Sequence, residues 1–568
     1  MAFNQDAYRE LEQVVGKNNV SQDIAMRESY RVINSQSSAH FGPYDVKSPM
    51  PGAVIMPGCT EEVQAIVKIC NKYNIPFKAA TTFWSVMGYI GDDDSLQIDM
   101  KRMKKMEFHE RDQYVVVEPY AIGAVVQVEA MKRGFNVNMA GVGCSSSTLA
   151  GTASWVAFGP SSCFMGVASE NMLATEWVLP NGELLRTGTL GAGGDWFCGE
   201  GPGPSIRGML RGMQGPAGSL GVCCRVAVRL HPWPGPRVLP SYGVGAAYKL
   251  VPQWNIKTYT LNFPNWEAYA NTINLLSQNN EIAYLGHRQF NMWGRYIKLP
   301  MLELLSDPEG QLCDLPKYMN DPYIAEQNKL CKIDLQVVIV GMTKRDMEWK
   351  EKALNEILRR VKGWKNEYML QPKIHDFVAL YLLRLGHKNL NYTLASSYEG
   401  SGGLSNNVFV TSKVMEEYHE MREEFDKHST ALAATGGDSE MGALSTLGGG
   451  GITGYEFFQW FDRHDRESVK GCCDFIQNYS QKLCDKYGFG ADMGNWNKTA
   501  RHPETDYYYT QDEQNEMFVG MAQPGLVTYQ YKVREAFNPL NLCGSYYRTL
   551  DPEYLKAYKA KQAKKAKK

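Results

Sequence analysis

The sequence predicts an α+β protein made of two structural units. Its 568 residues exceed the length at which a single hydrophobic core stops growing. Short strands alternate with helices up to residue 235, and longer elements follow. Between these stretches, residues 231–236 contain three prolines, which interrupt regular pairing. We therefore expect one domain over residues 1–235 and a second α+β domain over residues 236–504.

Composition is typical of a soluble globular protein, with 44% hydrophobic residues, 21% charged residues and a net charge of −1. No global positive field attracts nucleic acid. No long apolar run and no signal-peptide shape is found, so we expect a cytoplasmic protein without a membrane span. The lysines of residues 556–568 predict a solvated tail, with contact to an anionic surface as the alternative. We also expect a homo-oligomer.

The thirteen cysteines are scattered and form no C-x-x-C pair. Adjacent pairs such as Cys223 and Cys224 suit neither a metal nor a disulfide, because neighbouring side chains diverge. We expect most of them to be reduced and buried, and we expect no metal or iron–sulfur site.

Local patterns predict the elements of the first domain. Residues 53–56, 96–100 and 114–118 have the composition of strands, the second of them alternating. Thr60 is predicted to N-cap a helix, and Gly134 to close a later one. The first helix carries its apolar residues at helical spacing, namely Val63, Ile66, Val67 and Cys70. Pro180-Asn181-Gly182 predicts a hairpin between two strands, residues 175–179 and 183–186.

The second domain shows three helical stripes and one apolar strand. The strand covers residues 335–340. The stripes are Trp266, Tyr269, Ile273 and Leu276; Leu354, Ile357, Leu358 and Val361; and Val469, Cys472, Cys473, Ile476 and Leu483, ended by Gly488.

The usual phosphate-binding devices are absent. The chain has no G-x-x-x-x-G-K-[ST], and the glycines at 201, 203 and 208 have the wrong spacing for a dinucleotide fingerprint. The glycine run 448–451 lacks the following Lys-Ser/Thr, and we interpret it as a turn near the mouth of an active site.

Another series of segments occurs in a specific order. It begins with a strand and loop at residues 75–91, and residues 536–542 close it with Ala-Phe-Asn-Pro-Leu-Asn-Leu. The segments between are 115–119, 141–143, 179–188, 201–204, 215–222 and 228–232. In this order they resemble the vanillyl-alcohol oxidase and p-cresol methylhydroxylase family of FAD-binding flavoproteins.

The resemblance implies a two-domain PCMH-type FAD-binding fold, in which residues 505–568 complete the first domain and residues 236–504 form a larger substrate-binding (cap) domain. FAD is expected to be non-covalent because residues 81–91 contain no His or Cys, although a tether from His387 or His428 stays open. The alternative for residues 81–91, which are poor in glycine, is an ordinary buried loop. The residues implied to contact FAD are Thr81, Thr82, Phe83, Trp84, Ser85, Gly88, Pro119, Gly141, Gly143, Ser147, Gly151, Thr152, Gly221 and Val222.

Family members that oxidise para-substituted phenols hold the phenolate with two tyrosines and an arginine. Tyr89 matches one tyrosine, Tyr507 could replace the other, and Tyr508 stands at the arginine position. These three are our candidate catalytic residues, with core or strand aromatics as the alternative. Residues 547–549, a literal Tyr-Arg-Thr, lie after the closing segment and are interpreted as a decoy.

A second departure concerns the acid beside the flavin, whose position aligns with Val167, near Glu170. The phenol site is therefore modified, which fits a less acidic substrate or a bulkier ring. Arg288 and Arg295 could bind a substrate carboxylate, although surface salt bridges are the simpler interpretation. His387 and His464 are interpreted as surface or satisfied histidines.

The leading hypothesis is hydride transfer to flavin N5 from a benzylic or similarly activated carbon of a small aromatic, phenolic or alcohol substrate. A 2-hydroxyacid dehydrogenase is the alternative within the family, although its Gly-Asp-Gly-Asn-x-x-His stretch is missing. A non-redox flavin use, as in alkylglycerone-phosphate synthase, lacks the expected histidine cluster. The alternative of another class is a flavin-carrying electron-transfer subunit. The electron acceptor, whether oxygen, a cytochrome or a flavoprotein, stays open.

Overall fold

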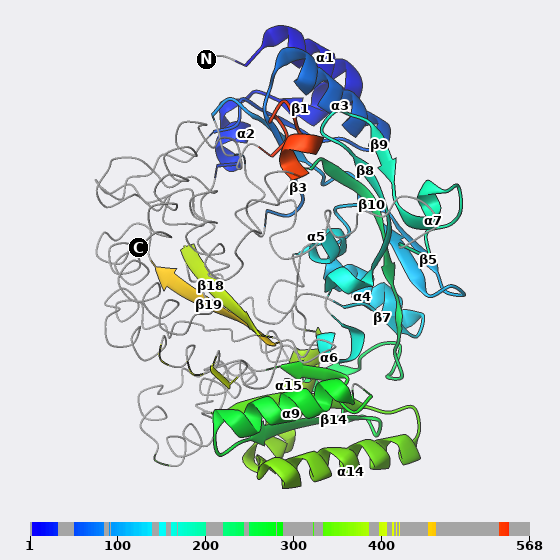
Figure 1. The fold of residues 1–568 in the computed structure, drawn as a ribbon, viewed down its shortest axis with the longest axis vertical. Coiled ribbons are helices and arrows are strands. Elements are labelled where there is room, and N and C mark those ends of the chain that lie inside the picture. Colours follow the sequence, from blue (N-terminus) through cyan, green and yellow to red (C-terminus); the bar gives the residue numbers. More distant parts are fainter. Residues whose placement is uncertain are drawn as a thin grey trace, which may run out of the picture.

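The structure is a computed structural model. It describes residues 3–31, 50–83, 90, 93–138, 147–154, 161–166, 168–199, 220–243, 249–279, 281–287, 322, 333–384, 397–405, 412–413, 416, 420, 453–461 and 533–544. Helices and strands are mixed in both halves of the chain, as the sequence predicts (Figure 1).

A four-stranded sheet, the small sheet, opens the fold in the order β1-β2-β4-β3. Strands β2 and β3 both pair parallel with β4, and β1 joins antiparallel at the edge. Two helices, α1 and α3, lie together over this sheet (Figure 1). The elements are α1 (Gln5–Val15), η1 (Lys17–Asn19), β1 (Val20–Ser21), α2 (Ile24–Ser29), β2 (Ala53–Ile55), α3 (Thr60–Tyr73), β3 (Phe77–Ala80) and β4 (Leu96–Asp99).

All four residues of β4 are buried, although the alternating sequence predicts one polar face. Gln97 is fully buried because its amide is satisfied inside the protein. The amide nitrogen donates to the Lys78 carbonyl at 3.0 Å, and the amide oxygen accepts from the Ile90 N–H at 3.2 Å. The strand is therefore confirmed, but both of its faces are covered, as is usual for parallel sheets.

A five-stranded antiparallel sheet, the large sheet, follows in the order β5-β6-β10-β8-β9. The predicted hairpin is confirmed, with Gly182 at φ 84° in its turn. Gly134, at φ 86°, directly follows the end of α4, as predicted. The elements are β5 (Met106–His109), β6 (Tyr114–Val117), α4 (Gly123–Lys132), β7 (Phe135–Asn136), α5 (Leu149–Ser154), α6 (Ser162–Met165), η5 (Ala168–Asn171), β8 (Met172–Val178), β9 (Leu184–Arg186), α7 (Gly188–Gly191), β10 (Val222–Arg229) and β11 (His231–Pro232).

Helix α3 links the small sheet to the large sheet through polar contacts. The Gln64 amide donates to the Gly182 carbonyl at 2.9 Å, and the Asn71 amide donates to the Pro180 carbonyl at 2.8 Å. Thr60 is not the N-cap, because Cys59 holds that position and Thr60 is the first helical residue. The Thr60 hydroxyl instead donates to the buried carboxylate of Glu176 at 2.9 Å, so tertiary contact replaces the predicted cap.

The second half of the chain contains an antiparallel sheet, the third sheet, in the order β15-β16-β14-β17. The predicted stripes of α9 and α14 pack on one face of this sheet, with Val361 half-buried at the edge. Helix α15 packs on the opposite face (Figure 1). The elements are β12 (Ser241–Tyr242), β13 (Lys249–Leu250), β14 (Ile256–Asn262), α9 (Trp266–Gln278), β15 (Leu285–His287), β16 (Asp334–Val340), α14 (Lys344–Val361), β17 (Trp364–Lys365), η7 (Tyr368–Leu370), α15 (Pro372–Arg384), β18 (Ser397–Ser405) and β19 (Thr453–Phe461).

The large sheet and the third sheet share one hydrophobic core. Tyr284 and Leu285, beside and within β15, belong to the same buried cluster as Val115 and Val117 of β6. Figure 1 shows the third sheet below the large one. Burial of a common apolar core fixes the two units relative to each other.

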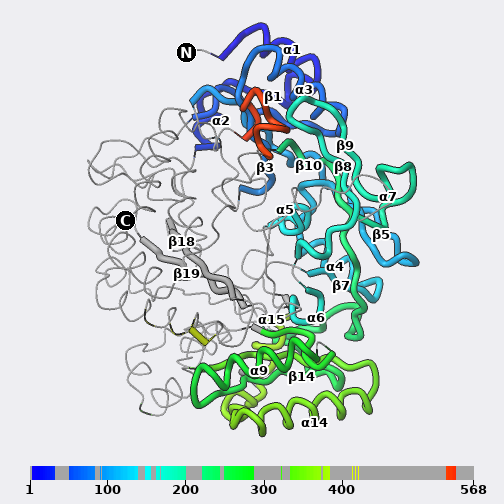
Figure 2. Tube along the Cα trace, viewed as in Figure 1, coloured from blue at the N-terminus to red at the C-terminus, as the bar shows by residue number. Residues whose placement is uncertain are grey.

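The C-terminal part of the chain returns to the small sheet. The Phe77 N–H donates to the Leu542 carbonyl, and the Gly544 N–H donates to the Phe77 carbonyl, both at 2.8 Å. Figure 2 shows this segment, residues 533–544, in red next to β3. Leu542 and Cys543 are buried in the core of the small sheet. A segment more than 450 positions away thus extends the edge at β3.

The described part of the chain contains seven cysteines and most of the predicted helices. The described cysteines are free; four are buried and three are half-buried, as expected for most of them. No helix among the described residues is long and apolar enough to cross a membrane. The stripe from Val469 to Leu483 lies outside the described residues.

Candidate cofactor site

The predicted cofactor residues that the structure describes lie on connections at the ends of strands. Thr81, Thr82 and Phe83 directly follow β3, and Pro119 follows β6. Ser147 precedes α5, which contains Gly151 and Thr152, whereas Gly221 directly precedes β10 and Val222 is its first residue. The remaining candidates lie outside the described residues: Trp84, Ser85, Gly88, Tyr89, Gly141, Gly143, Tyr507 and Tyr508. The same is true of Val167, Arg288, Arg295, His387, His428, His464, the glycine run 448–451, residues 547–549 and the lysine-rich tail.

Thr148 brings four of these candidates together, although the sequence did not single it out. Its hydroxyl oxygen lies 3.3 Å from that of Thr81 and accepts from the Gly151 N–H at 3.2 Å. Its carbonyl accepts both the N–H and the hydroxyl of Thr152. Ser147 is its neighbour in the chain. A threonine just before a short helix is a capping signal, which could have drawn attention to this position.

The connection before α5 is also tied to the one before α4. The Gly123 N–H donates to the Ser147 carbonyl at 2.9 Å, and the Leu149 N–H donates to the Ala121 carbonyl at 3.0 Å. Ile122 and Thr148 form an isolated antiparallel bridge. The backbone around Thr148 is therefore held from both sides, so the side chains of Thr81 and Ser147 project from a fixed frame.

Two hydroxyl groups in this frame are available as donors. The Ser147 Oγ is buried and has no hydrogen-bond partner among the described residues. When the Thr148 hydroxyl donates to Thr81, the Thr81 hydrogen is left for a further acceptor. A buried hydroxyl without a partner costs free energy. We therefore expect a group other than the described residues to accept a hydrogen bond from the Ser147 hydroxyl. Anionic oxygens are suitable acceptors for such a pair.

Gly221 has a structural reason to be glycine. Its φ is 112°, a region that L side chains rarely adopt. A Cβ at this position would overlap the Val178 carbonyl oxygen and lie 2.9 Å from Trp177 Nε1. The neighbouring Val222 pairs with Val178 and is buried in the core. The close approach of β10 to β8 thus explains, through packing, why position 221 is a glycine and position 222 a valine.

The loop expected to carry an acid is described only in part. Glu170 is exposed, and its carboxylate lies so close to Gly166 that a Cβ there would overlap it. Asn138, fully buried, accepts from the Ser161 hydroxyl at 3.0 Å and donates to Ser162 and to the Gly166 carbonyl. This polar cluster joins residue 138, the last described residue before the segment 141–143, to residues 161–166.

His231, in β11, is half-buried and pairs with Asn136 of β7. Its Nε2 donates to the Asn171 oxygen at 2.5 Å, because the Asn171 nitrogen donates to the Met165 carbonyl. Burial, together with the nearby Arg229, lowers the pKa of His231 to about 4. The neutral imidazole therefore acts as a structural hydrogen-bond donor at neutral pH. No cluster of three metal-ligating side chains is found in the described part of the chain.

Comparison with known proteins indicates which cofactor this site binds. A family model described as an FAD binding domain matches residues 51–188. The mitochondrial D-lactate dehydrogenase [cytochrome] of Arabidopsis thaliana is 28% identical over 193 residues, which cover 33% of this chain and 31% of that protein. The chain matches less than half the length of these curated relatives.

Solved structures share the fold over nearly the whole chain. p-Cresol methylhydroxylase with substrate bound superposes with a TM-score of 0.68 at 16% identity, covering 96% of this chain and 98% of that one. The 4-ethylphenol oxidase of Gulosibacter chungangensis, in complex with isoeugenol, gives 0.67 at 17% identity, with 97% and 98% covered.

The chain contains an FAD binding domain over residues 51–188 and shares the fold of p-cresol methylhydroxylase and 4-ethylphenol oxidase. Its cofactor is FAD. The described residues fit that group: the Ser147 hydroxyl has no partner among them, and the Thr81 hydroxyl can donate to a pyrophosphate oxygen when Thr148 donates to Thr81.

Proposed function

We propose that this protein oxidises a small organic substrate, aromatic, phenolic or alcoholic, by hydride transfer to FAD. The observation that carries the proposal is the FAD binding domain at residues 51–188 combined with a fold shared with p-cresol methylhydroxylase over 96% of the chain. When bound, FAD supplies a two-electron acceptor at its N5 atom. The match extends through the third sheet, so the unit beyond the FAD domain has a counterpart in a phenol-oxidising enzyme.

The residues of the chain are proposed to have two roles. Thr81 and Ser147 donate hydrogen bonds to the cofactor, with Thr148 fixing the first of them. Tyr89, Tyr507 and Tyr508 are proposed to bind the substrate and to stabilise negative charge on its oxygen. A site without the arginine of the phenol-binding subgroup favours a less acidic substrate or a bulkier ring.

The division of the chain follows from the same proposal. Residues 1–235 form the FAD domain, residues 505–568 complete it, and residues 236–504 form the cap domain. The hydrogen bonds between Phe77 and residues 542–544 support the return of the C-terminal part to the first domain. The shared core around Tyr284 supports a cap that is rigidly seated on the large sheet.

A 2-hydroxyacid dehydrogenase is the second candidate. It is favoured by the 28% identity to the D-lactate dehydrogenase of Arabidopsis thaliana. The absence of the Gly-Asp-Gly-Asn-x-x-His stretch argues against it. A flavin-carrying electron-transfer subunit is the candidate of another class, which has no organic substrate of its own.

The three candidates differ in which donor reduces the flavin. Purified protein is mixed under argon with a 4-alkylphenol, a benzylic alcohol or D-lactate, and the flavin absorbance near 450 nm is followed. Bleaching by the phenol or benzylic alcohol supports the main proposal, whereas bleaching by D-lactate alone overturns it in favour of the second. A yellow protein that no organic donor bleaches supports the electron-transfer subunit.

Two further measurements complete the assignment. Tyr507→Phe is expected to slow bleaching about tenfold or more while leaving the FAD content unchanged, because one hydrogen bond to the developing charge is lost. Acid precipitation is expected to release the flavin into the supernatant, as a non-covalent cofactor requires. Admitting oxygen or cytochrome c to the bleached protein then identifies the acceptor that restores the colour.

A further inference from the structure

Tyr30, at the C-terminal end of α2, forms a closed polar network with the end of β4. Its buried hydroxyl donates to the Asp99 carboxylate at 2.5 Å and accepts from the Lys101 ammonium at 2.8 Å. Lys101 also pairs with Asp99 at 2.7 Å, and its N–H donates to the other carboxylate oxygen. Burial and the bond to Asp99 raise the pKa of Tyr30 to about 12, so the phenol keeps its proton. Charge-assisted bonds of this kind hold the ring in one orientation.

The ring of Tyr30 meets Phe83, one of the residues implied to contact FAD. The two centroids lie 5.2 Å apart and the rings are almost perpendicular, at 80°. Phe83 has a φ of 55°, which is uncommon for a residue other than glycine. A residue in this conformation must be held by its surroundings, and the Tyr30 ring is a described contact that does so. Phe83 follows Thr81 and Thr82, which are also implied to contact FAD.

The N-terminal part of the chain also contacts residues 93 and 94, which come after residues 81–91 in the sequence. The Met50 N–H donates to the Asp93 carboxylate at 2.9 Å, and the Asp94 N–H donates to the Met50 carbonyl at 3.2 Å. Arg27 of α2 donates to the Pro51 carbonyl at 2.6 Å. Contacts from Tyr30 and Met50 therefore hold the chain at Phe83 and again at Asp93 and Asp94.

We propose that Tyr30 is a positioning residue for FAD, which orients Phe83 and thereby preorganises residues 81–83 for the cofactor. The proposal rests on the proposed role of those residues in FAD binding. Tyr30 itself need not contact the cofactor. Because the network holds Phe83 through contacts within the protein, its loss raises the entropic cost of ordering Phe83 when FAD binds. The effect is therefore expected on cofactor affinity and on flavin spectra, beyond any change in stability.

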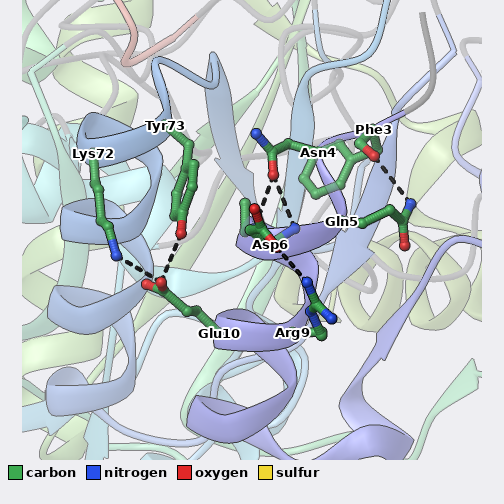
Figure 3. Close-up of polar contacts among 9 residues, drawn as sticks. Phe3, Asn4, Gln5, Asp6, Arg9, Glu10, Lys72 and Tyr73 are labelled. Carbon is green, nitrogen blue, oxygen red and sulfur yellow. Dashed lines mark hydrogen bonds and ion pairs between the residues drawn. The ribbon is translucent and has the colours of Figure 1, made fainter.

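The chain offers a matched control in the same region. Tyr73 of α3 donates to Glu10 at 2.7 Å, and Lys72 donates to the same carboxylate oxygen at 2.6 Å (Figure 3). This is also a tyrosine, acid and lysine network, but it joins α1 to α3, whereas the Tyr30 network joins α2 to the end of β4. Tyr73→Phe thus removes the same kind of bond without touching the loop.

The test measures FAD affinity of the apoprotein for Tyr30→Phe, Tyr30→Leu and Tyr73→Phe by quenching of flavin fluorescence, beside the Tm of each apoprotein. Tyr30→Phe is expected to raise the Kd for FAD about tenfold, and Tyr30→Leu further, since it also loses the ring contact. Tyr73→Phe is expected to keep the wild-type Kd. Amide hydrogen exchange in Tyr30→Phe should increase in peptides covering residues 78–99 and not in those covering α14.

The outcomes separate the two proposals. A wild-type apoprotein that binds no FAD removes the proposed role of residues 81–83, and the positioning role with it. Wild-type binding together with an unchanged Kd in both Tyr30 variants overturns the positioning role alone. An equal loss of affinity in Tyr30→Phe and Tyr73→Phe also overturns it, because the effect would then follow general stability. If Tyr30→Leu does not fold, Tyr30→Phe still decides the question.

Discussion

The hydroxyl oxygens of Thr81 and Thr148 lie 3.3 Å apart, although 67 positions separate these residues in the chain. Thr81 follows the edge strand of the small sheet, and Thr148 precedes a helix that packs under the large sheet. This pair is therefore a direct link between the two sheets of the FAD domain. Thr148 also caps Gly151, so a single side chain organises both of the connections that the cofactor is proposed to meet.

Thr148→Val should weaken both the apoprotein and its FAD binding. The substitution keeps the shape of the side chain but leaves the Gly151 N–H and the Thr81 hydroxyl without this partner, at a cost of about 1–3 kcal/mol. Thermal unfolding and FAD titration measure the two effects. Thr272→Val in α9 is the control, because it removes another hydrogen-bonded threonine hydroxyl, which donates to the Ala268 carbonyl at 2.9 Å. It should lower the Tm while leaving the Kd for FAD unchanged, and a change in its Kd would contradict the prediction.

Ser147→Ala should have opposite effects on stability and on binding. The buried hydroxyl has no partner among the described residues, so its removal should leave the Tm of the apoprotein unchanged or slightly higher. FAD affinity should fall about tenfold, since the hydroxyl is proposed to donate to the cofactor. Ser277→Ala removes another such buried hydroxyl, in α9, and should leave FAD binding intact. Equal FAD affinities for wild type and Ser147→Ala would exclude the proposed contact.

Gly221→Ala and Gly193→Ala should separate backbone strain from steric overlap. Both glycines have positive φ angles, 112° and 85°. A Cβ at Gly193 meets nothing within 4 Å, so this variant should lose about 1 kcal/mol for conformation alone. Gly221→Ala also forces β10 away from the Val178 carbonyl and should lose several kcal/mol or fail to fold. Similar Tm values for the two variants would contradict the overlap.

His231 should make the protein less stable in mild acid. Its pKa is about 4 in the folded protein against 6.5 for the free side chain, so between these values only the unfolded chain binds the proton. The contribution of the neutral His231 to the free energy of unfolding is complete above about pH 6.5. It is lost as the pH falls towards about 4, and the total loss is about 3 kcal/mol. Urea unfolding from about pH 7.5 to about pH 4.5 measures the slope. The difference between wild type and His231→Gln should change over this interval, and parallel curves would rule the effect out.

Local elements of the fold could be predicted from sequence because their signals act between near neighbours. The hairpin at Pro180-Asn181-Gly182 and the stripe of α9 are confirmed in full. The prediction for Thr60 was wrong because a polar residue before a helix can cap it or bind elsewhere, and the buried Glu176 lay 116 positions away. The family could also be recognised, since the order of its motifs is a property of the chain alone.

The sequence by itself predicted the FAD binding domain, the order of its elements and the loops that are proposed to meet the cofactor. Only the tertiary structure decided which side chains hold those loops, because the partners are far apart in the chain. Thr148 meets Thr81 across 67 positions, and Tyr30 meets Asp99 across 69. No spacing rule encodes such pairs, since they form only when the sheets have packed and their polar groups must be satisfied.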